Sequence, residues 1–202
     1  MPRICIVPQV DGLAGVASFR LKFEDGLRLR GVDVIHDPSQ GADVIFVLAG
    51  TKNLLPLWKA SRHGTRIVQR LDGINWVHHA RWAGLRYTLR AIYGNANLSF
   101  IRARFAGHVI YQSQFIKRWW EDWYGTARVP SSVILNGVDL SRYTPDGLHE
   151  RPSQHVRLLV VEGSLVGGLD SGLHHAVKLS NALSKNFRIE LFIVGRVDAH
   201  TE

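Results

Sequence analysis

The sequence predicts an α/β protein built on a doubly wound parallel sheet. Short apolar segments alternate with helical segments along the chain, as in strands joined by helical crossovers. The first apolar segment, Ile4–Val10, is almost entirely apolar, as a strand is when helices cover both faces of its sheet. The same alternation begins again at Val156 after a polar stretch, so we expect two domains of one type.

Six strands are predicted in the first domain. The first strand leads through the glycine-containing loop 11–15 into a helix whose apolar residues recur at steps of three and four from Val16 to Leu27, and Gly31 closes this helix. The next strands are expected at Val32–His36, Ala42–Leu48, Arg66–Leu71, His108–Gln112 and Ser132–Leu135, with a tight connection between the first two of these. The next helices are expected at Asn53–His63, at His79–Ala106 with a break near Gly94-Asn95, and at Gln114–Tyr124.

The segment Ser131–Asp139 ends this domain and is interpreted as a hinge. Asn136 and Gly137 both tolerate a positive φ, so they predict a turn. Asp139 is expected to cap the short turn that follows, which Pro145 stops. We therefore expect a first domain at 1–145.

A polar linker at 146–155 precedes the second domain, which occupies 156–202. Its predicted elements are a strand at Val156–Val161, a loop at Glu162–Asp170, a helix at Ser171–Lys185 and a strand at Ile189–Val194. Because two strands and one helix cannot cover both faces of a parallel sheet, we expect this domain to be incomplete.

Composition favours a cytoplasmic protein. The chain has 202 residues, 46% of them hydrophobic, which is typical of a globular protein. No apolar run approaches the roughly 18 residues that a membrane span needs. The single cysteine, Cys5, lies within the first strand, so we interpret it as a small core residue and not as a nucleophile.

The positive charge belongs to the first domain. The formal net charge is +8, and residues 156–202 contribute none of it. Between Lys59 and Arg118 there are eleven basic residues and a single acid, Asp72. Such a field attracts nucleic acid, anionic lipid or a phosphorylated substrate, and charge does not choose among them. A nucleic-acid partner is disfavoured because no known reading motif is present.

Asp72 is the candidate catalytic residue. It follows the fourth predicted strand, and open α/β sheets bind ligands at the carboxyl ends of their strands. A carboxylate there orients a hydroxyl or accepts its proton, and the surrounding arginines are expected to keep it ionised. A structural cap or a salt bridge with Arg70 is an equally good interpretation.

The segment after Asp72 is rich in aromatic and basic residues. On a helical wheel an apolar stripe has Arg81 and Arg86 on its flanks, which is typical of an interfacial helix. A helix packed on the sheet, with its arginines extended to water, gives the same pattern and is the simpler interpretation. The stripe comprises Trp82, Leu85, Leu89, Ile92 and Tyr93. The residues proposed for an acceptor or an anionic surface are Trp76, His78, Arg81, Arg86 and Arg90.

No metal site is predicted. The sequence contains no Walker loop, no D-x-D, no H-E-x-x-H and no cysteine-based metal spacing. The side chains of His78 and His79 are expected to diverge, which disfavours a shared metal. The pair Gly12 and Gly15 opens the first helix as G-x-x-G, and serves either to bring backbone N–H groups near an anion or merely to turn the chain.

Several of these segments together resemble the family 4, or group 1, glycosyltransferases. The resemblance rests on Gly15-Val16 at the start of a helix, on Val109–Phe115, and on Val133–Asp139 followed by Tyr143-Thr144-Pro145. It implies a GT-B type protein with two facing Rossmann-like domains, the first for the acceptor and the second for the nucleotide-sugar. It also implies retention at the anomeric carbon, no metal and no cofactor.

The resemblance assigns individual roles. Gly15 matches the glycine beside the donor diphosphate, and Asp72 falls where many members carry a histidine. The loop with Gly163 and Ser164 matches the one that usually offers an arginine and a lysine to the diphosphate, but the corresponding positions here hold Ser164 and Leu169. The family's late pair of glutamates would fall beyond Glu202.

The resemblance thus implies a retaining glycosyltransferase of polysaccharide biosynthesis. It would move a sugar from a nucleotide-sugar donor to a hydroxyl of a glycan or lipid-linked acceptor, with closure about Asn136-Gly137. The 202-residue chain alone is expected to be inactive. The alternative is a non-catalytic binding protein on the same scaffold. A peripheral contact with an anionic membrane at its inner face fits the basic first domain.

Overall fold

In the computed structural model the chain divides into two compact units, Met1–Gly137 and Val138–Glu202. The structure describes residues 1–12, 15–80, 82, 84–141, 143–146, 152–163, 165 and 171–196.

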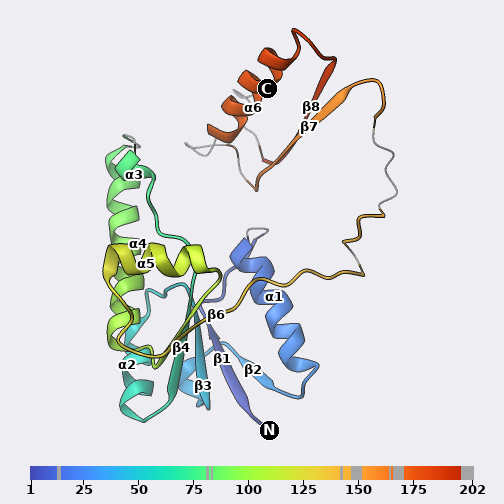
Figure 1. The fold of residues 1–202 in the computed structure, drawn as a ribbon. Coiled ribbons are helices and arrows are strands. Elements are labelled where there is room, and N and C mark those ends of the chain that lie inside the picture. Colours follow the sequence, from blue (N-terminus) through green and yellow to red (C-terminus); the bar gives the residue numbers. More distant parts are fainter. Residues whose placement is uncertain are drawn as a thin grey trace. The chain divides into compact units, whose positions relative to one another are not determined.

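The first unit contains a six-stranded, wholly parallel sheet in the order β2-β1-β3-β4-β5-β6 (Figure 1). The strands are β1 (Arg3–Val7), β2 (Asp33–Ile35), β3 (Val44–Leu48), β4 (Arg66–Leu71), β5 (His108–Tyr111) and β6 (Ser131–Val133). The predicted doubly wound α/β fold is confirmed. Because β2 and β3 lie on opposite sides of β1, the strand order reverses between β1 and β3, where open sheets bind ligands.

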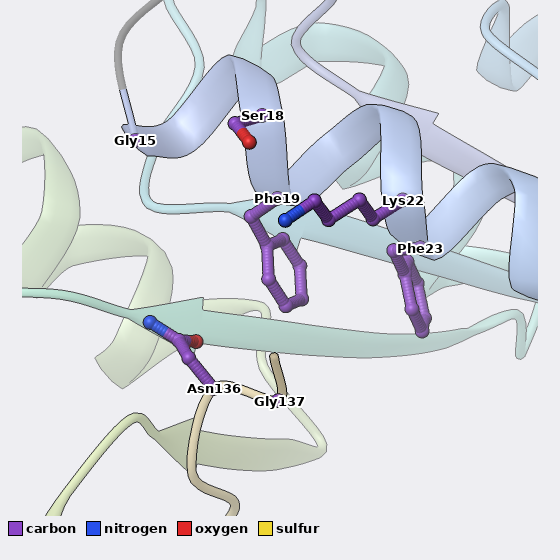
Figure 2. Close-up of a pocket in the computed structure, with 7 residues that line it drawn as sticks. All are labelled: Gly15, Ser18, Phe19, Lys22, Phe23, Asn136 and Gly137. Carbon is purple, nitrogen blue, oxygen red and sulfur yellow. The ribbon is translucent and has the colours of Figure 1, made fainter. Parts of the chain in front are cut away.

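One face of this sheet is covered by α1 (Gly15–Arg28). Phe19 and Phe23 project from α1 toward the sheet (Figure 2) and pack with Ile6, Phe46 and Leu48 of β1 and β3. The spacing of four residues places both rings on one side of the helix, as the sequence pattern predicts.

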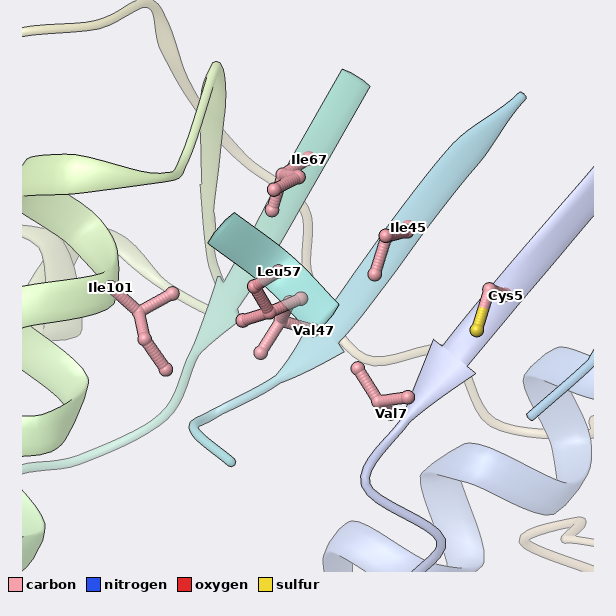
Figure 3. Packing of buried hydrophobic residues seen from close by; sticks show 7 residues of the cluster. All are labelled: Cys5, Val7, Ile45, Val47, Leu57, Ile67 and Ile101. Carbon is pink, nitrogen blue, oxygen red and sulfur yellow. The ribbon is translucent and has the colours of Figure 1, made fainter. Parts of the chain in front are cut away.

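The opposite face is covered by α2 (Leu54–Arg62), α4 (Leu85–Arg104) and α5 (Gln114–Tyr124). Its central cluster, drawn in Figure 3, comprises Cys5, Val7, Ile45, Val47, Leu57, Ile67 and Ile101. Cys5 is fully buried here, and burial raises the pKa of its thiol to about 12. Its interpretation as a core residue is confirmed.

The predicted break near Gly94-Asn95 is wrong. The short helix α3 (Val77–Ala80) is separate, and α4 runs without interruption from Leu85 to Arg104. Asn95 instead clamps the loop after β4: its Oδ1 accepts from the backbone N of Asn75 at 3.0 Å, and its Nδ2 donates to the carbonyl of Asn75 at 2.9 Å. A Cβ at Gly94 would lie 3.2 Å from the Asn75 amide, so glycine permits this close approach.

The turn predicted at Asn136-Gly137 is also wrong. Neither residue has a positive φ, and the sixth strand ends at Val133 instead of Leu135. The expected cap at Asp139 is confirmed, since its Oδ1 accepts from the N and the Oγ of Ser141. The connection between β2 and β3 is not a simple tight turn but contains the 3-10 helix η1 (Pro38–Gln40).

The second unit contains β7 (Val156–Val161) and β8 (Ile189–Val194), which pair in parallel, and α6 (Ser171–Leu183). Leu165 and Leu173 are buried in it. Apolar side chains of both strands, among them Leu159, Val161 and Phe192, remain exposed. The order of strand, helix and parallel strand is the one predicted from the sequence.

Leu57→Ala tests the packing of α2 against the sheet. Leu57 is fully buried, so its truncation is expected to lower the free energy of unfolding by about 2–5 kcal/mol. All six tryptophans lie between Trp58 and Trp123, so denaturation followed by tryptophan fluorescence reports on the first unit. Leu55→Ala is the control, because Leu55 is 58% exposed on the same helix and its loss should change stability by under about 0.5 kcal/mol. Equal losses in the two variants would contradict this packing.

Candidate functional site

The carboxyl edge of the sheet is organised around Arg70, near the end of β4. Its side chain lies on the α1 side of the sheet, and the residue is only 3% exposed. A buried guanidinium is costly unless charged or polar partners satisfy it.

Arg70 is satisfied by partners from four parts of the unit. Its Nη1 donates to Asp72 Oδ1 at 2.5 Å. Its Nη2 donates to Asn136 Oδ1 at 2.8 Å and, more weakly, to Gln112 Oε1 at 3.4 Å. The guanidinium also lies over the Phe19 ring of α1, 3.8 Å from its centroid. One side chain therefore joins the loops after β4, β5 and β6 to helix α1.

Asp72 is held from two sides. Its carboxylate binds Arg70, and its carbonyl accepts a hydrogen bond from Trp120 Nε1 at 2.7 Å. Burial raises the pKa of Asp72 above its ordinary value, while Arg70 acts in the opposite direction. Desolvation therefore outweighs Arg70 in setting this pKa, so the net shift is opposite to the one that the arginine alone would cause. The salt bridge with Arg70 considered from the sequence is present.

Beside α1 lies a pocket of about 330 Å³ (Figure 2). Its described lining residues are Gly15, Ser18, Phe19, Lys22, Phe23, Asn136 and Gly137. Gly15 thus shares a pocket with Phe19 and Asn136, which both contact Arg70, and Arg70 in turn binds Asp72. The N-terminus of α1 and the Lys22 ammonium favour an anionic group here.

The loop after β3 is fixed by polar side chains at the switch point. Ala49 has a φ of 59°, a conformation that costs a non-glycine residue roughly 1–3 kcal/mol. Its carbonyl accepts from Gln69 Nε2 at 2.7 Å and its N donates to the Arg70 carbonyl at 2.8 Å. Asn97 of α4 donates to the Thr51 carbonyl at 3.0 Å. The loop is therefore held in a strained conformation at the place where open sheets bind ligands.

The other described residues that were predicted for the site lie in the segment after β4, on α4 and in the second unit. Trp76 is about half exposed and precedes α3, which contains His78. Arg86 and Arg90 are exposed on α4, and Gly163 is exposed in the second unit. Arg81 and Ser164 lie outside the described residues.

The two histidines of α3 do not diverge as expected. The rings of His78 and His79 lie 4.0 Å apart, and His79 meets Trp123 edge-on at 4.6 Å. Burial, together with the neighbouring His79, lowers the pKa of His78. Within the described ranges, no group of three or more His, Cys, Asp or Glu side chains is arranged to hold a metal ion.

The apolar stripe, made of Trp82 just before α4 and of Leu85, Leu89, Ile92 and Tyr93 on the helix, is exposed. Exposed fractions run from 51% at Ile92 to 78% at Trp82, with Leu85, Leu89 and Tyr93 between these values. The simpler interpretation, in which this stripe packs on the sheet, is therefore wrong. Among the described helices, none is both long and apolar enough to cross a membrane.

Comparison with known proteins places the chain in a family. A family model described as Glycosyltransferase Family 4 matches residues 3–142. The chain belongs to this family. The search of curated proteins gives no match. Membership establishes a role in glycosyl transfer in general terms, with a sugar donor and an acceptor as substrates.

The match to the glycosyltransferase family covers all six strands of the first unit and every residue of the Arg70 network. Sequence reasoning singled out Asp72 and Gly15 and named Arg70 as a salt-bridge partner of Asp72, but it missed Gln112 and the side-chain role of Asn136. A signal was available: Gln69 and Arg70 are adjacent polar residues inside an otherwise apolar strand, where each needs a partner.

Arg70→Met tests the network in this glycosyltransferase. Removing the guanidinium leaves Asp72 and Asn136 without their partner, so we expect a loss of about 1–3 kcal/mol in the free energy of unfolding. The pKa of Asp72 should rise further, because Arg70 now lowers it. Denaturation and carboxyl NMR titration, with the signal assigned through Asp72→Asn, measure both effects.

Arg66→Met is the matched control, since Arg66 is exposed at the start of the same strand. It should change stability by less than about 0.5 kcal/mol. An unshifted Asp72 titration in Arg70→Met would contradict the network.

Proposed function

We propose that the protein is a retaining glycosyltransferase that moves a sugar from a nucleotide-sugar donor to a hydroxyl of a glycan or lipid-linked acceptor. Family membership carries this proposal, and the pocket at Gly15 beside the Arg70 network supports it. The proposed domains are 1–145 for the acceptor side and 156–202 for the start of the donor side, joined by the linker 146–155.

The donor diphosphate is proposed to lie near Gly15, where backbone N–H groups at the start of α1 and the Lys22 ammonium offer positive charge. Gly163 and Ser164 are the proposed contribution of the second domain. Ser164 and Leu169 stand where the family usually has a basic pair, so we expect the 202-residue chain alone to show no transfer. No metal or other cofactor is required by the proposal.

Asp72 is proposed to orient the acceptor hydroxyl and to take its proton as the new glycosidic bond forms. Its partial burial and its bond to Arg70 hold the carboxylate in one position. Trp76 and His78, in the following segment, are the proposed acceptor contacts.

The test is sugar transfer by the protein expressed from its whole reading frame. A panel of nucleotide-sugars with oligosaccharide and lipid-linked acceptors should give a product whose anomeric configuration, read by NMR, equals that of the donor. Inversion would overturn the retaining mechanism. Binding of donor and acceptor without any turnover would favour the alternative, a non-catalytic binding protein.

Asp72→Asn should lower turnover by about a hundredfold to ten-thousandfold, the usual contribution of a positioned base, with donor affinity nearly unchanged. The variant keeps the shape of the side chain and removes its charge. Asp25→Asn, at an exposed site on α1, is the control and should retain full activity. If Asp72→Asn stays within a few-fold of the parent, Asp72 is structural, and His78 or His79 is the next candidate.

The exposed stripe of α4 is proposed to contact an anionic membrane at its cytoplasmic face. Exposed apolar side chains from Trp82 to Tyr93 stand beside the exposed Arg86 and Arg90, and the only acid between Lys59 and Arg118 is Asp72. Apolar groups then enter the lipid surface while arginines bind its headgroups.

Flotation with liposomes of anionic and neutral lipid measures this contact. The protein should bind anionic vesicles at low salt, lose binding as salt screens the charges, and bind neutral vesicles weakly. Arg86→Ala with Arg90→Ala should weaken binding severalfold. The control is Arg30→Ala with Lys52→Ala, which removes the same charge from exposed sites elsewhere. If both double variants lose the same amount of binding to anionic vesicles, the binding depends only on net charge and not on the stripe of α4.

A further inference from the structure

A second pocket, of about 210 Å³, lies at the carboxyl edge of the sheet. Its walls come from the loops after β1, β2 and β3 and from the start of α2. Val7 and Leu57 are among its lining residues and belong to the cluster drawn in Figure 3, so the pocket lies on the α2 side of the sheet. It is smaller than the roughly 300 Å³ or more of a drug-sized pocket, which limits it to a single ring.

Five polar residues line this pocket: Gln9, His36, Asp37, Thr51 and Asn53. The ring nitrogens of His36 already lie against the Ile6 carbonyl at 3.2 Å and Glu24 Oε1 at 3.6 Å, which leaves the other four side chains for a ligand. Amide, carboxylate and hydroxyl groups offer both donors and acceptors, which is what a set of ring hydroxyls requires. Pro8, Pro38 and Pro56, which also line the pocket and are partly exposed, offer apolar surface to the C–H face of a sugar ring.

Asn53 occupies the N-cap position of α2 but does not cap the helix. Its backbone φ and ψ are −88° and 85°, and its side chain makes no capping hydrogen bond. Within the part of the chain that the structure describes, neither its amide nor that of Gln9 makes a side-chain hydrogen bond. An asparagine at this position normally stabilises its helix by bonding to the first N–H groups, so its amide here remains available to a ligand.

Asp37 presents a fixed carboxylate. Its Oδ1 accepts from the Ser39 N at 2.9 Å and from the Ser39 Oγ at 2.7 Å, which leaves Oδ2 to accept from a ligand hydroxyl. The bond from the Ser39 N–H, with that from its hydroxyl, lowers the pKa of Asp37. The carboxylate is therefore ionised at neutral pH.

The charge of this pocket excludes a phosphate. Asp37 contributes a negative charge, none of the described lining residues is a lysine or an arginine, and the one histidine, His36, has its Nε2 against the Glu24 carboxylate. A diphosphate would meet repulsion without a compensating cation, whereas a neutral sugar would not.

We propose that this pocket binds one neutral sugar residue of the acceptor glycan, through Gln9, Asp37, Thr51 and Asn53. The assignment to an acceptor rests on the proposed glycosyl transfer. The ligand that fits the pocket is a ring with neighbouring hydroxyl groups. The ribose of a nucleoside has the same feature and is the alternative ligand.

The test is saturation-transfer difference NMR on the complete 202-residue chain. The probes are methyl glycosides of glucose, galactose, mannose and N-acetylglucosamine. Uridine and adenosine test whether the pocket binds ribose instead. At least one glycoside should receive saturation and neither nucleoside should compete with it. Gln9→Ala with Asn53→Ala should weaken that glycoside at least tenfold.

Lys52→Ala is the matched control, because Lys52 lies between Thr51 and Asn53, is exposed and does not line the pocket. It should bind as the parent does. Asn53→Ala should leave the thermal midpoint unchanged, whereas a lost helix cap would lower it. Absence of glycoside binding, unchanged binding by the double variant, or competition by the nucleosides would each overturn the proposal.

Failure of this proposal differs from failure of the proposed function. If the protein transfers sugar and its KM for the acceptor is unchanged in Gln9→Ala with Asn53→Ala, the pocket does not bind the acceptor, but the proposed glycosyltransferase function stands. If the parent protein binds a glycoside but shows no transfer activity, and the double variant loses that binding, the pocket binds sugar but the proposed reaction is wrong.

Discussion

The need to satisfy one buried charge governs the carboxyl edge of the sheet. Arg70 lies inside a strand, where water cannot solvate it, so three side-chain oxygens and an aromatic ring take the place of water. Those partners come from the loops after β4, β5 and β6 and from α1. The planar guanidinium reaches several of them at once, and a lysine ammonium would not reproduce this fork. The geometry around Asp72 and the Gly15 pocket follows from this constraint.

Helix α4 provides the second constraint. Its buried Asn95 clamps the loop after β4, and its Asn97 holds the loop after β3 through the Thr51 carbonyl. The Leu98 carbonyl and that of Ala49 share the amide of Gln69, which ties the same helix to the strained residue at the switch point. The first half of α4 also carries the exposed apolar stripe, so one rigid element connects that surface to both loops.

Local sequence patterns predicted the strands and most helices because apolar periodicity records burial directly. They failed at Gly94-Asn95 and at Asn136-Gly137, where residues that usually break or turn a chain make tertiary contacts instead. Asp72 and Gly15 were found because they follow predicted strands. The pocket that contains Gln9 and Asn53 was not, because its members are 44 positions apart and only the parallel sheet brings their loops together.

The pocket beside α1 and the smaller pocket beside α2 differ in charge in a way that suits two substrates. The pocket beside α1 combines a helix N-terminus, a lysine and two aromatic rings, and Arg70 lies against one of those rings. The pocket beside α2 combines a carboxylate with neutral amides and, in its described lining, no cation. A diphosphate is attracted to the first and repelled by the second, whereas a neutral sugar gains hydrogen bonds in the second without opposing charge. If the proposed function holds, charge alone would therefore keep the donor and the acceptor from exchanging places at one sheet edge.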